Sequence, residues 1–235
     1  VQVFDKDLNF RHKFGQYGRQ PQDMMGPHGV SADSRGNIVL ANLGGTTDGK
    51  FLTSGNLMNR FSLGEYCTNP YGLAVQRDGR VVVADPGKHS VFLFEADGTL
   101  VKQVGGQGQG EGQFNLPYFV CVDKEDNIIV ADKSNNRVQV FDKSLNFKHK
   151  FGQNGRQPQD MWAPHGVSAD SRGNLVLANR SGKKLQVFCP DGTWVSNISS
   201  DGDKLNLPHG VAVTEDGHVF VTDTGDHCIR KYRYM

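Results

Sequence analysis

Three histidines occupy equivalent places in the sequence, each directly after a proline: His28, His165 and His209. Tyr71 and Tyr118 follow a proline in the same context. Three imidazoles brought together could hold a zinc ion with an open coordination position, as in a catalytic site. However, no acidic residue recurs beside them to orient the rings. Packing or direct ligand contact is the preferred interpretation, and a metal site at His28, His165 and His209 is the alternative.

A second recurring set is a short acidic or amide side chain at the end of an apolar run: Asn42, Asp85, Asp132, Asn179 and Asp223. Five copies in register indicate a structural role, in which each side chain binds the backbone N–H groups of the loop that follows. The sequence contains no Ser-His-Asp arrangement, P-loop or HExxH motif. We therefore predict no catalytic residues and no cofactor.

These residues belong to a repeat. The phrase PHGVSADSRGNIVLAN begins at Pro27, and related phrases begin at Pro70, Pro117, Pro164 and Pro208. Residues 1–42 are nearly identical to residues 138–179. Each unit contains an apolar run, a polar turn, a β-branched run and two further short runs, without a helical period. Four short strands per unit of 40 to 50 residues predict an all-β fold, the β-propeller.

Closure of the ring is the open question. The last unit ends after its third strand, near Cys228–Met235, and Phe10–Phe14 reads as a fourth strand with no unit before it. Pairing of these terminal strands predicts a single domain, 1–235, with five blades. The extra strand Val1–Phe4 competes for the same position. An incomplete six-bladed ring, lacking two inner strands, is the alternative.

Composition limits the class of protein. The chain has 26 Lys+Arg and 25 Asp+Glu, without a basic tail, which argues against a general polyanion binder. A local basic patch is still compatible with this balance. No stretch approaches 18 apolar residues, so we expect no contact with a membrane. Four scattered cysteines predict free thiols in a reducing compartment, here the cytoplasm.

Two segments resemble the NHL repeat of tripartite-motif (TRIM-NHL) proteins: GQFNLPYFVCVDKEDNIIVADKSNNRVQVFDKSLNFKHKFG, residues 112–152, and GHVFVTDTGDHCIRKYRYM, residues 217–235. The resemblance covers essentially the whole chain. It implies a recognition module, binding RNA in some members and protein partners or substrates in others, like the substrate-recognition end of a RING-type ubiquitin ligase. Known propellers of this family usually have six blades, so five units are a departure. Ubiquitin transfer would need a RING domain, which these residues do not contain, so we do not expect an enzyme.

Antiparallel strands place the fourth-to-first and second-to-third loops on one face of a propeller. Aromatic and cationic side chains on that face suit single-stranded RNA, and they equally suit a protein partner. The predicted binding face contains Tyr17, Arg19, His28, Tyr71, Lys88, Tyr118, Lys133, Arg137, Arg156, Trp162, His165, Arg180, Lys183 and His209. The competing hypothesis is a channel-metal propeller enzyme, a lyase or lactonase-like protein, that uses the three histidines.

Overall fold

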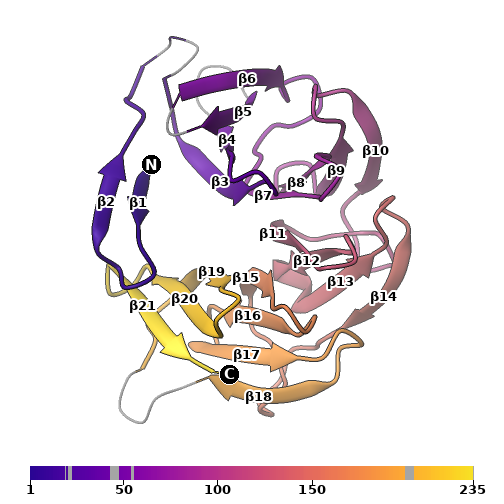
Figure 1. The fold of residues 1–235 in the computed structure, drawn as a ribbon. Helices are drawn as coiled ribbons and strands as arrows, with labels where there is room; N and C mark the ends of the chain where they lie inside the picture. Colours follow the sequence, from indigo (N-terminus) through magenta and orange to yellow (C-terminus); the bar gives the residue numbers. More distant parts are fainter. Residues whose placement is uncertain (19, 21–22, 43–47, 54–55, 199–203, 235) are drawn as a thin grey trace.

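The computed structural model describes residues 1–18, 20, 23–42, 48–53, 56–198 and 204–234. Within these residues the regular secondary structure is β-strand, except for a single 3-10 turn, η1 (Lys133–Asn135). Figure 1 shows the strands gathered into sheets around a central axis. The predicted all-β propeller is confirmed. None of the helical structure in the described ranges is long and apolar enough to cross a membrane.

Five of the sheets follow the predicted repeat, and we number them blades 1 to 5 in chain order. Blade 1 contains β3 (Pro27–Ala32), β4 (Ile38–Asn42), β5 (Asp48–Thr53) and β6 (Asn56–Ser62). Blade 2 contains β7 (Gly72–Val75), β8 (Val81–Asp85), β9 (Ser90–Phe94) and β10 (Leu100–Gly105). Blade 3 contains β11 (Pro117–Val122), β12 (Ile128–Asp132), β13 (Arg137–Phe141) and β14 (Phe147–Phe151). Blade 4 contains β15 (Pro164–Ala169), β16 (Leu175–Asn179), β17 (Lys184–Phe188) and β18 (Trp194–Ile198). Blade 5 has three described strands, β19 (Pro208–Val213), β20 (His218–Asp223) and β21 (Cys228–Arg233).

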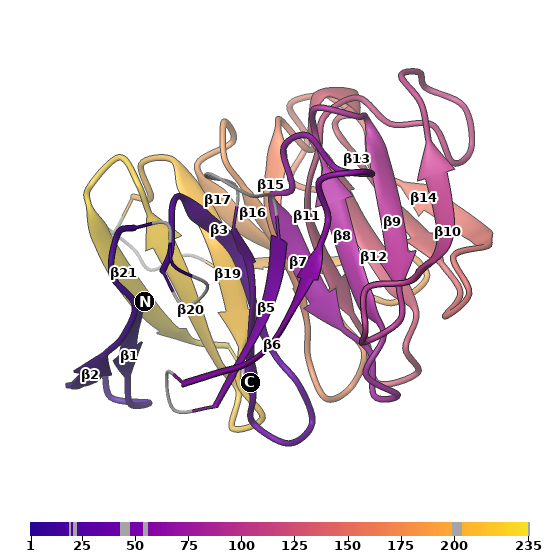
Figure 2. The same ribbon diagram turned by 90° about the horizontal axis from the view of Figure 1, so that it is seen from above.

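The second strand of each blade is apolar at nearly every position because both of its faces are covered. In β8, Val81 and Val83 pack in a core shared with blade 1. The alternate residues Val82 and Ala84 pack in a core shared with blade 3. Successive side chains of a strand point to opposite faces, so a strand between two neighbouring blades needs apolar residues on each face. The blades are therefore held together by the cores between them. Figure 2 shows the sheets from above.

All blades are antiparallel and use their strands in chain order from the axis outward. This arrangement brings the fourth-to-first and second-to-third loops together, as predicted, and the residue that ends each second strand fastens them. Asn42 and Asp132 accept backbone N–H bonds from Met25 and Asn115, each at 2.8 Å. The predicted structural role is confirmed, with one correction. The bonds come mainly from the loop that precedes the anchor proline of the same unit. At Asp85 the loop that follows the second strand is held as well, because Asp85 accepts a bond from the N–H of Lys88.

The termini do not close the ring by pairing. β1 (Gln2–Phe4) pairs with β2 (Phe10–Lys13) in a separate two-stranded sheet, and β21 pairs with β20 among the described strands. The expected clasp is absent among the described strands because a local turn pairs β1 with β2. The Asp5 carboxylate accepts the N–H groups of Asp7 and Asn9, each at 2.9 Å, and so closes that turn.

We call β1 and β2 the half-blade. It lies between blade 5 and blade 1 in Figure 1. Val1 and Phe14 pack against Met24 and Leu40 next to blade 1. Toward blade 5, the Lys231 ammonium donates to the carbonyl oxygen of Lys6 at 2.6 Å. The five blades and the half-blade match the incomplete six-bladed ring, the alternative arrangement in the sequence analysis.

Candidate ligand-recognition site

The side chains that follow the anchor prolines meet at one end of the axis. Ring centroids are 4.6 Å apart for Tyr71 and Tyr118, 4.8 Å for Tyr118 and His165, and 4.9 Å for His165 and His209. The Tyr71 hydroxyl lies 3.4 Å from Nε2 of His209 and completes the circle. We call these four residues the aromatic cluster. The repeat positions them because each lies at the start of the innermost strand of its blade or directly before it.

His28, the fifth equivalent residue, departs from a symmetric ring. It stacks on Tyr71 with a centroid distance of 4.5 Å, but it is exposed. The reason is that β3 has a neighbouring inner strand, β7, on one side, while its other side faces the gap beside the half-blade.

Phe119 also belongs to this site, and sequence reasoning missed it. Its ring lies 5.7 Å from that of Tyr71 and 5.3 Å from that of His209, centroid to centroid. The other four units have glycine at the equivalent position, so the change from glycine to phenylalanine was a signal available in the sequence.

Two cations border the cluster, both from second-to-third loops. The Lys133 ammonium lies 4.3 Å from the centroid of the Tyr118 ring, within the range of a cation–π interaction. Arg180 is half-buried, and its Nε is buried without a hydrogen-bond partner. The charge of the Arg180 guanidinium acts on both His165 and His209, so it faces the cluster and can attract an anionic group of a ligand.

The imidazoles of buried His165 and half-buried His209 are neutral at physiological pH. Burial lowers the pKa of His165 to about 3, opposed in part by a hydrogen bond with the Ala163 carbonyl. Burial, with the positive charges of Arg180 and Lys133, lowers the pKa of His209 to about 4. The site therefore presents neutral rings beside two side chains that carry its positive charge.

With this geometry, the comparison with known proteins is informative. The model of a family described as "NHL repeat" matches residues 114–141 and 205–232, which lie in blades 3 and 5. The chain contains NHL repeats. The protein brain tumor of Drosophila melanogaster is 27% identical over 107 residues, covering 45% of this chain and 10% of the fly protein. The aligned stretch is thus a small part of that relative.

Among solved structures, a streptogramin B lyase matches this propeller with a TM-score of 0.70 and 16% identity, covering 100% of this chain and 76% of the other. A catalytically inactive virginiamycin B lyase of Staphylococcus aureus, solved with quinupristin, matches with a TM-score of 0.67 and 13% identity, covering 99% and 76%. At this identity the likeness establishes the propeller fold.

Two of the residues predicted on the binding face are buried: His165, which is 2% exposed within the aromatic cluster, and Arg137, which lies outside the cluster. Arg137 is 7% exposed, and its guanidinium lies 2.8 Å from the Asp132 carboxylate. The same group donates to the carbonyl oxygens of Gln109, Gly110 and Gln113. Arg137 therefore belongs to the framework that holds the loops, because all of its donor nitrogens are used inside the protein.

The remaining predicted residues lie farther out on the same face. Tyr17 is 82% exposed and Trp162 is 60% exposed. Lys88, Arg156 and Lys183 are also exposed, and the Lys183 ammonium donates to Asn206 Oδ1 at 3.2 Å. Arg19 lies outside the described residues. The acids at the ends of the second strands, Asp85, Asp132 and Asp223, are buried and thus do not cover this face with exposed carboxylates.

The three histidines of the alternative metal site do not form a cluster of their own. Tyr71 and Tyr118 stand between His28 and His165 in the order of ring contacts. In the part of the chain that the structure describes, no three His, Cys, Asp or Glu side chains come together as a metal-binding group.

Proposed function

We propose that this NHL propeller is a non-catalytic recognition module of TRIM-NHL type that binds single-stranded RNA at the aromatic cluster. The observation that carries the proposal is the pair of cations, Lys133 and Arg180, beside contiguous aromatic rings. Bases stack on rings, and phosphates pair with ammonium and guanidinium groups, so RNA uses both features of the site.

The charge distribution of this face favours a nucleic acid as the ligand. The carboxylates that end the second strands are buried and accept bonds from backbone N–H groups, such as that from Asn115 to Asp132. The guanidinium of half-buried Arg180 supplies positive charge for a phosphate group. Exposed Trp162 and Tyr17 offer further stacking surfaces on the same face. A near-neutral net charge is compatible with this because it averages over both faces of the ring.

The test is selection from a random single-stranded RNA pool at near-physiological salt. We expect enrichment of a short motif whose binding is weakened by Arg180→Ala and by Lys133→Ala. Featureless binding with a steep salt dependence would indicate general charge attraction and would contradict the proposal. Capture of a protein partner at the same face, without RNA enrichment, would replace RNA by protein as the ligand.

A second candidate is a channel-metal enzyme of the lyase or lactonase type. His165 and His209 are adjacent and neutral, which leaves their nitrogens available as ligands or bases, and two of the structural neighbours are lyases. Metal analysis of the purified protein separates the candidates. Stoichiometric zinc that is lost on His165→Ala would favour the enzyme, and its absence after incubation with zinc would favour recognition.

A further inference from the structure

One inner strand has an uncovered face. Val30 of β3 is 59% exposed. Its equivalents in blades 2 to 4 are 4% to 5% exposed: Leu73, Val120 and Val167. These three are covered by their neighbouring blades, so the exposure of Val30 marks a place where that neighbour is missing.

On the blade 5 side of the gap, a neighbouring blade is missing as well. A Cβ atom added at Gly29, Gly72 or Gly166 would meet the carbonyl oxygen of the next inner strand at 2.4–2.5 Å. At the equivalent Gly210 of β19, the one atom of the described residues within 4 Å is Thr222 Oγ1 of the same blade, at 3.2 Å. Each inner-strand glycine thus touches the next blade where there is one, and Gly210 has none.

The half-blade supplies the third observation. Residues 1–14 repeat residues 138–151, so β1 and β2 correspond to β13 and β14 of blade 3. In blade 3, β12 pairs with the other edge of β13, from Ile128 opposite Phe141 to Asp132 opposite Arg137. Among the described strands, β1 pairs with β2 alone, so the other edge of β1 is free.

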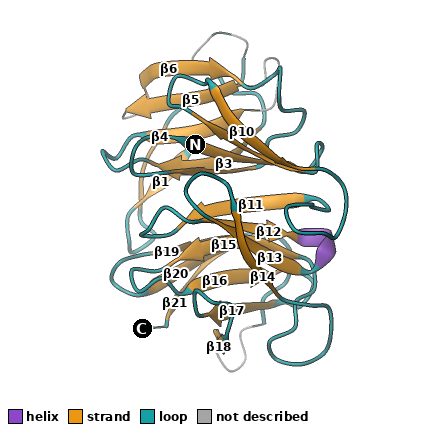
Figure 3. Ribbon diagram, turned by 90° about the vertical axis from the view of Figure 1, so that its right-hand side faces the viewer, coloured by secondary structure: helices purple, strands orange, loops and turns teal. Residues whose placement is uncertain are grey.

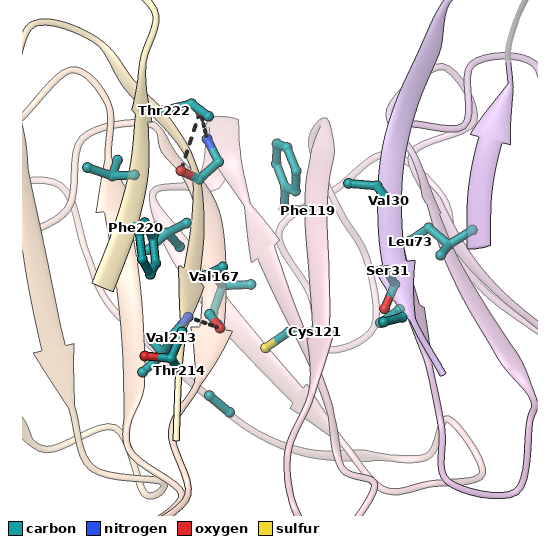
Figure 4. Close-up of a pocket in the computed structure, with 18 of the residues that line it drawn as sticks. Val30, Ser31, Leu73, Phe119, Cys121, Val167, Val213, Thr214, Phe220 and Thr222 are labelled. Carbon is teal, nitrogen blue, oxygen red and sulfur yellow. Dashed lines mark hydrogen bonds between the residues drawn. The ribbon is translucent and has the colours of Figure 1, made fainter. Parts of the chain in front are cut away.

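A cavity of about 920 Å³ is lined by the inner strands of all five blades and extends to these surfaces. It is lined by Val30 on one side, by Phe220 and Ile229 of blade 5 on the other, and by Phe4 of the half-blade. Figure 4 shows Val30 pointing from β3 into the space opposite Phe220 and Thr222. Phe4 and Ile229 are 37% and 42% exposed, an apolar surface at the edge of the gap.

We propose that this gap binds a two-stranded β-hairpin with the sequence pattern of β11–β12, supplied by a partner polypeptide. Its second strand adds to the free edge of β1, and its first strand lies between β19 and β3. The hairpin continues the interface that already joins each blade to the next. Backbone pairing at β1 provides affinity, and apolar side chains against Val30, Phe220 and Ile229 provide specificity.

The test uses a labelled peptide with the sequence of residues 116–136, carrying Cys121→Ser to prevent disulfide formation. We expect saturable binding to the 235-residue chain by fluorescence anisotropy, with slower amide exchange in β1 and β3. The control peptide carries Ile128→Asp and Val130→Asp, and it should not bind. On the protein, Val30→Asp should weaken binding at least tenfold, whereas Val101→Asp, at an exposed site (45%) on β10, should not.

A second measurement avoids dependence on peptide affinity. Residues 116–137 copied directly before Val1 should raise the melting temperature by about 5 °C or more, since added apolar burial stabilises a chain of this size. An unchanged melting temperature together with no peptide binding would overturn the proposal. Concentration-dependent dimerisation that is abolished by Val30→Asp would also overturn it, because the occupant would then be a second copy of the chain.

Discussion

The buried ion pair between Asp132 and Arg137 makes the assignment of Arg137 to the framework testable. Asp132 is fully buried, and its carboxylate receives bonds from Arg137 Nε at 2.8 Å, Asn115 N at 2.8 Å and Asn135 Nδ2 at 2.9 Å. Asp132→Asn keeps the shape of the side chain and removes its charge. The Arg137 guanidinium would then remain buried without a counter-charge.

Loss of one partner of a buried pair costs about 3–5 kcal/mol of unfolding free energy. We expect the lower end, about 3 kcal/mol, because three backbone carbonyls still accept bonds from the guanidinium. Blade 4 shows how the chain avoids the problem. Asn179 stands in place of Asp132 and Lys184 in place of Arg137, and the Lys184 ammonium donates instead to the Pro158 carbonyl.

The double variant Asp132→Asn/Arg137→Lys reproduces that solution. It should recover at least about 1 kcal/mol relative to Asp132→Asn, a coupling that urea unfolding resolves. The matched control is Asn179→Asp, which should not reproduce the effect, because Lys184 is only half-buried there. A cost below about 1 kcal/mol for Asp132→Asn would refute the reasoning, since it would mean that the Arg137 charge is solvated.

Three further predictions concern packing, pH and the aromatic cluster. Gly72→Ala would place a Cβ 2.5 Å from the Tyr118 carbonyl oxygen and should cost about 1–3 kcal/mol in urea unfolding, whereas Gly210→Ala should cost less; equal costs would be inconsistent with a gap at β19. The folded pKa of His165, about 3, lies below the unfolded value of about 6.5, so stability is full above pH 6.5 and falls as the pH drops. At pH 5 the loss from His165 is about 2 kcal/mol, and a pH-independent unfolding midpoint between pH 7 and 5 would argue against its burial. Tyr118→Ala should weaken binding of a selected RNA about fivefold to a hundredfold and Tyr118→Phe much less, by fluorescence anisotropy; equal affinity of Tyr118→Ala and the wild type would exclude stacking there.

The repeat made most of the fold predictable. A fixed phrase at Pro27, Pro70, Pro117, Pro164 and Pro208 located every inner strand, and the β-branched runs located the buried second strands. Closure was not predictable in the same way. Whether Phe10–Lys13 pairs with β1 or with β21 is decided by competition, and the local turn at Asp5 favours β1.

The candidate site was predictable at the level of repeat position, and less so at the level of the side chain. The positions after the anchor prolines are equivalent in the repeat, and the side chains at four of them do lie together: Tyr71, Tyr118, His165 and His209. It could not tell that Arg137 turns inward, because that depends on carbonyl groups of a loop 24 to 28 residues earlier in the chain. It also could not tell that His28 lies exposed, since the missing neighbour is visible only once the blades are placed around the axis.

The most direct test of the account is the affinity of a selected single-stranded RNA for the double variant Lys133→Ala/Arg180→Ala. We expect a loss of at least about tenfold, since two phosphate contacts beside the aromatic cluster would be removed. Lys143→Ala is the matched control, because Lys143 is exposed in a third-to-fourth loop on the opposite face and should bind as the wild type. An unchanged affinity of the double variant, or an equal loss for Lys143→Ala, would contradict recognition at this site.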